Sequence, residues 1–168
     1  MILKRMLDII ARCSHTDSLN GWRRFVVSDL RESGCMCGAV RVEISGDPGA
    51  MAFCHCESCR GWLGAPVHAA SLWPTDNVRV VKGEDKLGMY QRTEASHRQF
   101  CTDCGTPVLI RHPQIGMTDV PAGSISGFKY EPTIHVHYGE KVLVIKDGLP
   151  KYKDFPENFG GSGDMVPE

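Results

Sequence analysis

The chain has 168 residues, of which 42% are hydrophobic, and its formal net charge is −1. This length fits one domain better than two, and the hydrophobic fraction is large enough for an ordinary core. The near-neutral charge, with basic residues scattered along the chain, argues against a nucleic-acid partner. No apolar run approaches the roughly 20 residues that a membrane-spanning helix needs, so no membrane partner is expected either.

Residues 1–32 are predicted to form a leader that is partly helical or disordered. Basic residues precede a short apolar run near its start, as in a targeting segment, but Asp8 interrupts that run and Arg12 ends it. The run is therefore short for a secretory signal, and the acidic residues of the leader disfavour a mitochondrial presequence. We accordingly expect a reducing, cytoplasmic location, and we interpret Cys13 in the leader as a bystander thiol.

The compact domain is predicted to span residues 33–155 and to be mainly β. Residues 39–44 alternate between apolar and charged side chains, which is typical of a half-buried strand. A turn rich in glycine and proline follows over residues 45–49. Further strands are predicted over residues 78–81, 107–111, 133–138 and 142–145. Many short strands joined by polar turns indicate an all-β or mostly-β domain, and residues 156–168 are expected to form a loose tail.

Seven of the eight cysteines fall in three tight clusters with the patterns C-x-C, C-x-C-x-x-C and C-x-x-C. An even cysteine count alone would suit a secreted disulfide framework. Clusters this close instead place several thiolates within reach of one cation, and thiols persist and bind metal in a reducing compartment. The spacing therefore favours metal binding over disulfide formation.

The first and last clusters are predicted to form one closed zinc site. Its ligands would be Cys35, Cys37, Cys101 and Cys104. Two residues between the last two cysteines let both sulfurs face one point, and Gly105 can adopt a positive φ that brings the following backbone close. Four thiolates around one zinc ion, with Zn–S near ~2.3 Å, form a structural site that contributes folding free energy directly. The alternative is a set of buried or redox-active thiols.

The middle cluster supplies three thiolates, and no further cysteine of the domain is left to complete it. Its members are Cys54, Cys56 and Cys59. Three protein ligands with one open position are typical of a reactive zinc. The three thiolates would leave the site with a net charge of about −1, which makes it a poor Lewis acid for water but suits a soft incoming thiolate. In total we predict two zinc ions per chain.

Two residues within or beside this cluster are candidates for a catalytic role. His55 lies between two predicted ligands and could be a fourth ligand, but adjacent side chains tend to diverge, so we disfavour this. It could equally be a polar residue that is hydrogen-bonded at the turn. Arg60 could balance the negative site or hold a substrate carboxylate, and the alternative is a solvated surface charge.

Other histidines and tryptophans carry weaker signals. His135 and His137 share one face of the predicted strand 133–138 and could bind a metal as a pair, but we interpret that face as the solvent-facing side of the strand. Trp62 and Trp73 could wall the open site, but a place in the core is expected for each of them.

Four segments of the chain match a known pattern, namely residues 34–40, 54–60, 100–107 and 147–150, the last of which reads Asp-Gly-Leu-Pro. With these segments the sequence resembles the glutathione-dependent formaldehyde-activating enzyme family, relatives of centromere protein V. The resemblance covers about residues 33–155, and its ordered set of seven cysteines is specific. One departure is Val142, which stands near the place where many members carry a tryptophan.

The resemblance implies an Mss4-like fold, with curved antiparallel sheets stapled by zinc and few helices. It also implies that the four-cysteine set is structural and that the three-cysteine set lies at the active site. The implied activity is that of a carbon–sulfur lyase acting on a thiol adduct of a small electrophile, as when glutathione adds to formaldehyde to give S-hydroxymethylglutathione. The expected partners are therefore a small-molecule thiol such as glutathione and a small aldehyde. The alternatives are a non-catalytic zinc-binding interaction module and a redox or metal-handling protein.

Overall fold

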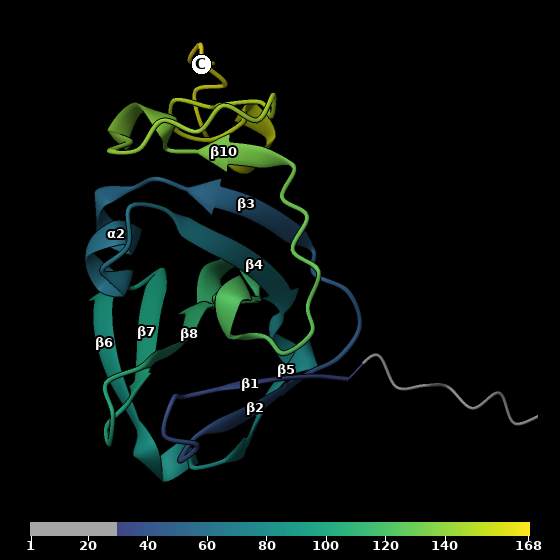
Figure 1. Cartoon of the computed structure of the whole chain (residues 1–168), viewed down its shortest axis with the longest axis vertical. Coiled ribbons are helices and arrows are strands. Elements are labelled where there is room, and N and C mark those ends of the chain that lie inside the picture. The colour runs from purple at the N-terminus through teal and green to yellow at the C-terminus, as the bar shows by residue number, and fades with distance from the viewer. Residues whose placement is uncertain (1–29) are drawn as a thin grey trace, which may run out of the picture.

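The computed structural model describes residues 30–168, in which ten short strands form two sheets with one α-helix beside them (Figure 1). The prediction of a mainly-β domain with few helices is confirmed. The predicted leader, Cys13 included, lies outside the described residues except for residues 30–32. Within the described residues, no helix is long and apolar enough to cross a membrane.

The smaller sheet contains three antiparallel strands in the order β1-β2-β5. Its strands are β1 (Arg31–Gly34), β2 (Arg41–Ile44) and β5 (Val78–Lys82). The strand predicted over residues 39–44 begins two residues late, because the chain before it closes a turn in which the Cys35 amide donates to the Val40 carbonyl (3.1 Å). That turn carries the first pair of cysteines.

The larger sheet has the strand order β10-β3-β4-β9-β8-β7-β6. Its strands are β3 (Ala50–Cys54), β4 (His68–Pro74), β6 (Leu87–Thr93), β7 (Ser96–Cys101), β8 (Pro107–His112), β9 (Met117–Asp119) and β10 (Ile134–Val136). All neighbours are antiparallel except β10, which pairs with β3 in parallel. The strand predicted over residues 133–138 is shortened to β10 because His137, with φ of 53°, turns the chain away.

The main core joins the two sheets. Its buried residues include Cys35, Val40, Val42, Ile44, Trp73, Cys101 and Leu109. The alternating segment 39–44 therefore buries its apolar face as predicted, and Trp73 lies in the core as expected. Because Cys35 and Cys101 belong to the same cluster of buried residues, the four-cysteine set lies directly against the core.

The single α-helix of the described residues, α2 (Glu57–Leu63), starts directly after β3. Cys56 stands at its N-cap with extended backbone, and its sulfur accepts a hydrogen bond from the Cys59 amide (3.2 Å). Gly64 is the C-cap of the helix and has a φ of 62°. Glycine adopts this left-handed conformation with little strain because it has no Cβ. A cysteine predicted to bind metal thus also caps the helix that follows it.

Residues 142–145, predicted to be a strand, do not form one. Three apolar side chains of this segment are between 42% and 64% exposed. The edge of β10 that such a strand would pair with is occupied by a later segment, since the His135 amide donates to the Pro150 carbonyl (2.8 Å) and the Tyr152 amide to the His135 carbonyl (2.9 Å). A local apolar pattern does not show which of two segments will pair with a given strand edge.

The segment 156–168 is hydrogen-bonded to the rest of the domain, which differs from the loose tail that the sequence suggested. The Val166 amide donates to the Lys151 carbonyl (2.8 Å), and the Lys153 amide donates to the Asp164 carbonyl (2.8 Å). These bonds hold the tail beside β10, at the end of the molecule that lies uppermost in Figure 1. The tail therefore packs against residues 151–153, which pair with the outer edge of β10.

Candidate metal centres and the adjoining cavity

The first and last cysteine clusters converge to form what we call the four-cysteine site. It consists of Cys35, Cys37, Cys101 and Cys104, whose sulfurs all lie within 4.8 Å of one another. Cys37 Sγ is 3.5 Å from Cys35 Sγ and 3.8 Å from Cys101 Sγ. The β1–β2 turn and the β7–β8 turn each contribute to it, so the site ties the small sheet to the large one.

Electrostatics in the four-cysteine site favour a bound cation. Hydrogen bonds from Thr106 lower the pKa of Cys104 to about 6. A backbone hydrogen bond from Ala39 lowers the pKa of Cys37, but the sulfurs of Cys104 and Cys35 outweigh it and raise that pKa to about 12. Neighbouring sulfurs thus oppose full ionisation, and a divalent cation would remove the conflict by accepting all four thiolates.

The middle cluster forms the three-cysteine site, in which the sulfurs of Cys54, Cys56 and Cys59 lie within 4.8 Å of one another. Cys54 ends β3, and the other two residues belong to the N-cap and first turn of α2. Within residues 30–168, no further histidine, cysteine, aspartate or glutamate joins this group of ligand atoms. One short segment therefore supplies a partly buried set of three soft donors with a fourth position left open.

The three sulfurs share protons in a way that also fits a cation. Hydrogen bonds from Cys54 and Cys59 lower the pKa of Cys56 to about 2. The same contacts, together with burial, raise the pKa of Cys54. For Cys59, the hydrogen bond with Cys54 lowers the pKa, but contact with Cys56 raises it to about 12. Sulfurs packed this closely therefore oppose one another's ionisation, and a soft divalent cation such as Zn²⁺ would displace their protons.

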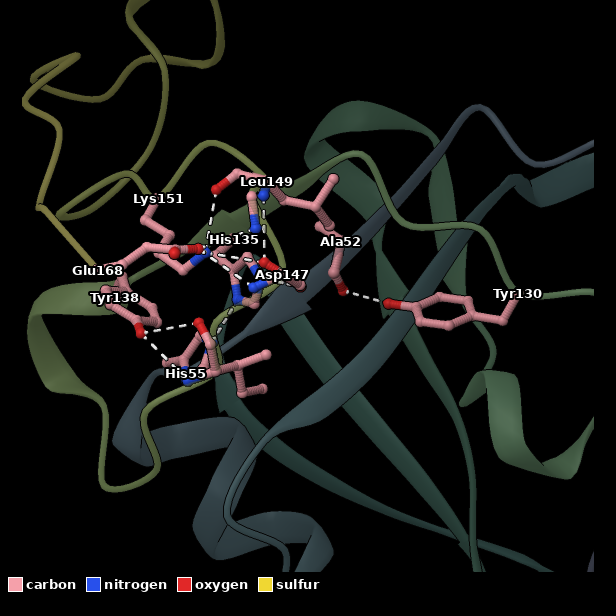
Figure 2. A network of polar contacts seen from close by, with 11 residues as sticks. Ala52, His55, Tyr130, His135, Tyr138, Asp147, Leu149, Lys151 and Glu168 are labelled. Atoms are coloured by element: carbon pink, nitrogen blue, oxygen red, sulfur yellow. Dashed lines mark hydrogen bonds and ion pairs between the residues drawn. The ribbon is translucent and has the colours of Figure 1, made fainter.

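The side chain of His55 points toward His135 and Tyr138, as Figure 2 shows. Its ring is fully buried, and its Nε2 lies 2.8 Å from His135 Nδ1. Burial, followed by the charge of His135, lowers the pKa of His55 to about 4, so the ring is neutral. The structure therefore places His55 in a hydrogen-bonded role behind the site and outside the ligand group.

Arg60 is bound to the protein backbone. Its Nε donates to the His55 carbonyl (2.9 Å), and its Nη2 donates to the Glu140 carbonyl (3.2 Å). The sequence left open whether Arg60 is a solvated surface charge or a group that holds a substrate carboxylate. In the structure its guanidinium is already hydrogen-bonded to two backbone carbonyls. Arg60 fastens the start of α2 to the segment that follows β10.

His135 corrects the sequence-based interpretation, because it is fully buried and does not face solvent. Its ring lies between Phe53 and Tyr138, at centroid distances of 5.0 and 5.5 Å. His137, expected on the same face, is instead turned aside by its positive φ and pairs with Glu140 (3.1 Å). The two histidines are therefore not a pair of ligands.

A cavity of about 350 Å³ adjoins the three-cysteine site. Trp62 and Tyr90 stack in its wall at 6.3 Å, and Arg92 also lines it. Buried Arg98 connects the cavity to the site, because it donates to both oxygens of Ser58 (2.7 Å each) and its Nη2 is 3.9 Å from Cys59 Sγ. Trp62 is thus a wall residue, the alternative that the sequence did not favour.

Residues 30–140 match the family model described as glutathione-dependent formaldehyde-activating enzyme. This chain belongs to that family. An uncharacterized lyase of Schizosaccharomyces pombe is 33% identical over 81 residues, which are 48% of this chain and 57% of that protein. Proteins of Aspergillus flavus and Aspergillus oryzae, provisionally named glutathione-dependent formaldehyde-activating enzymes, are 31% identical over 94 residues, or 52% of this chain and 49% of theirs. The chain thus spans about half the length of these curated relatives.

A solved structure supports the fold of this family member. The crystal structure of a Rhodobacter sphaeroides protein is 26% identical to the chain and superposes with a TM-score of 0.50. The match covers 58% of this chain and 90% of that protein.

One polar pair beside the three-cysteine site was missed from the sequence. His68 of β4 lies directly opposite Cys54 in the antiparallel register, so the two side chains share one face of the sheet. Its Nε2 is 2.7 Å from Asp119 Oδ2, and both side chains are buried. Burial lowers the pKa of His68, but the charge of Asp119 raises it more. Nothing in the local spacing marks either residue, because only the pairing of β3, β4 and β9 brings them together.

Proposed function

We propose that this chain catalyses the addition of the glutathione thiol to formaldehyde, giving S-hydroxymethylglutathione, which is a carbon–sulfur lyase reaction in the reverse sense. One observation carries the proposal. Three cysteines converge without a fourth protein ligand in the described residues, and Arg98, which lines a cavity together with Trp62, reaches to 3.9 Å from Cys59 Sγ. The names of the family and of its relatives agree with this chemistry.

Zinc is the metal that both donor sets fit best. The four-cysteine site would hold one ion in a closed structural role, and the three-cysteine site would hold a second ion with one position free. When bound there, zinc would favour the deprotonated form of an incoming thiol. The positive charge of Arg98, 3.9 Å from Cys59 Sγ, offsets part of the negative charge that three thiolates bring.

The reaction itself needs a positioned thiol and little else. A bond forms between the thiol sulfur and the aldehyde carbon, the carbonyl π bond breaks, and the proton lost by the thiol ends on the new hydroxyl. The cavity would orient the body of glutathione, which has two carboxylates and one ammonium group. Arg92 and Glu57 in its wall carry the complementary charges, and the stacked rings of Trp62 and Tyr90 offer an apolar surface.

The test is to follow adduct formation from glutathione and formaldehyde by exchange NMR with zinc-loaded protein. The matched control is Cys56→Ser, which keeps a capping oxygen for α2 but removes a soft ligand. We expect acceleration over the uncatalysed rate with the wild-type protein and none with the variant. Other thiols and aldehydes run in parallel identify the preferred pair. A wild-type protein that holds two zinc ions and does not accelerate the glutathione reaction would contradict the proposal.

An exposed apolar patch favours a second candidate function, that of a non-catalytic zinc-binding interaction module. The patch consists of Val142, Leu143 and Val144, at 64%, 42% and 55% exposure. Exposed apolar groups of this kind often mark contact sites. This candidate predicts two bound zinc ions and no acceleration with any thiol and aldehyde pair, so the same experiment separates it from the enzyme.

A further inference from the structure

A continuous series of polar contacts runs from the tail to His55, the residue between Cys54 and Cys56 in sequence (Figure 2). Glu168 binds the ammonium group of Lys151, which in turn donates to Asp147 Oδ1 (2.8 Å). Asp147 Oδ2 lies 2.9 Å from His135 Nε2, and His135 Nδ1 lies 2.8 Å from His55 Nε2. This series of contacts therefore ends at His55, which lies between Cys54 and Cys56 in the sequence.

The outer end of this chain of contacts is charged although its lysine is buried. Lys151 is 1% exposed, and its three N–H donors are used by Asp147, by the Leu149 carbonyl (3.1 Å) and by Glu168. Partial burial raises the pKa of Asp147, but the hydrogen bonds from Lys151 and His135 lower that pKa by a larger amount. The carboxylate is therefore ionised. An ionised carboxylate only accepts hydrogen bonds.

The chemistry of these donors and acceptors fixes the direction of every contact. Because Asp147 only accepts, His135 must donate from Nε2. One hydrogen joins His135 Nδ1 to His55 Nε2, and only donation by His55 avoids an unpaired N–H at the other nitrogen of His55. His55 therefore donates from its Nε2 and has no proton on Nδ1. That second nitrogen is buried without a hydrogen-bond partner among the described residues, and this tautomer leaves a lone pair there instead of an unpaired N–H.

His55 is held at several points, so its orientation affects the two cysteines beside it. Its amide donates to the Val136 carbonyl (3.0 Å), and its carbonyl accepts from Arg60 (2.9 Å). Its ring stacks on His135 at 5.1 Å and meets Tyr138 edge to face at 4.8 Å. With backbone and ring both fixed, the backbone that carries Cys54 and Cys56 has little freedom to move.

We propose that His135, Asp147 and Lys151 are positioning residues that act through His55 to hold the three-cysteine site in its metal-receiving geometry. The inference rests on the proposed function in one respect, namely that this site takes zinc. Groups that orient metal ligands from behind typically change metal affinity by roughly 10- to 100-fold when they are removed. The four-cysteine site has no contact with this chain of residues and provides an internal reference.

The experiment uses the full chain with three substitutions. His135→Phe keeps a buried aromatic ring but removes both hydrogen bonds, and Asp147→Asn keeps the shape but removes the charge. His97→Phe, in a half-buried strand position on β7, is the matched control. Zinc content, melting temperature and zinc release to a chelator are measured for each protein. After mild chelation, Co²⁺ is added and its d–d absorption reports the geometry of the refilled site.

We expect the wild type and His97→Phe to hold two zinc ions per chain. His135→Phe should keep the more resistant ion and bind the labile one roughly 10- to 100-fold more weakly, with shifted cobalt bands. Asp147→Asn should change the zinc affinity and the cobalt bands in the same direction but by a smaller amount. If His135→Phe does not fold, the result with Asp147→Asn tests the positioning role. A destabilisation without effect on geometry would lower the melting temperature and leave the cobalt bands unchanged.

Two results would overturn the proposal, and they can be told apart. If the wild type holds two zinc ions and neither variant changes the affinity or the cobalt bands, the positioning role is wrong while the proposed function stands. If the wild type holds only the resistant ion, the three-cysteine site does not take zinc, and the proposed function fails together with the inference.

Discussion

The two cysteine sites are built in opposite ways. The four-cysteine site joins two turns whose Cys37 and Cys101 are 64 positions apart in sequence, and it lies against the main core. The three-cysteine site comes from a single short segment, and behind it hydrogen bonds run from His55 through buried His135 to Asp147. A closed site can obtain its geometry from the metal that links its parts. An open site with one ligand fewer needs a protein frame to keep its sulfurs together.

The comparison predicts that loss of one ligand has very different consequences at the two sites. Cys104→Ala should unfold or aggregate the domain, because structural zinc supplies about 10–16 kcal/mol of apparent binding free energy and total stabilities are only about 5–15 kcal/mol. The measurement is thermal unfolding followed by circular dichroism, together with zinc content. A Cys104→Ala protein that melts at the wild-type temperature would show that this site is not structural.

At the open site, Cys56→Ala should abolish activity and remove one zinc ion while the fold survives. Its sulfur also caps α2 at 3.2 Å, and loss of a cap costs about 1 kcal/mol, which lowers the melting temperature by only about 2–4 °C in a domain of this size. Cys56→Ser restores a capping oxygen, so it should recover the melting temperature but not the activity. Loss of both zinc ions in one step with unfolding would remove the distinction between the two sites.

A smaller effect is expected from the cavity, which adjoins only the three-cysteine site. Arg92→Gln should raise KM for glutathione by roughly 1.4- to 5-fold, because an exposed charge pair contributes about 0.2–1 kcal/mol. The turnover of a small neutral thiol should not change. The matched control is Arg79→Gln on β5, whose side chain is 75% exposed in the small sheet. Equal effects of the two substitutions would mean that the cavity does not bind the thiol.

Much of this contrast could be predicted from the sequence, because cysteine spacing is local information. The mainly-β class and the strand starting near Val40 followed from patterns within short windows. The division of seven cysteines into sets of four and three followed from the spacing within each cluster together with the number of cysteines in the domain. The frame behind the open site could not be predicted in the same way. His135 was assigned to the solvent side from alternation alone, and the structure buries it because the segment after Pro150 covers the edge of β10.

The same reason explains the other misses. The apolar residues 142–145 look like a strand, but the edge that they would need is already paired. The pair formed by His68 and Asp119 depends on the register between β4 and β9, two strands that are far apart in the chain. Competition for a sheet edge and the register between distant strands are properties of the whole fold, and a single sequence does not display them.

The smallest effect concerns that buried pair beside the open site. The folded-state pKa of His68 is raised above its ordinary value of 6.5, because the charge of Asp119 outweighs the cost of burial. A raised pKa contributes stability that is fully present below pH 6.5 and is lost as the pH rises through the folded-state value. Asp119→Asn removes the charge but keeps an oxygen that can accept from the Ser71 amide (3.1 Å). The difference in unfolding free energy between wild type and variant should therefore be largest near pH 6 and narrow toward pH 9.

Urea unfolding at several pH values measures this difference in unfolding free energy. Ionisation of the cysteines in the unfolded chain cancels from the difference because both proteins share it. Asp103→Asn, which replaces an exposed carboxylate next to the four-cysteine site, is the control. Its difference in unfolding free energy from the wild type should not narrow between pH 6 and pH 9. A constant difference for Asp119→Asn would mean that His68 is neutral throughout, and that the open site is supported by hydrogen bonds without a buried ion pair.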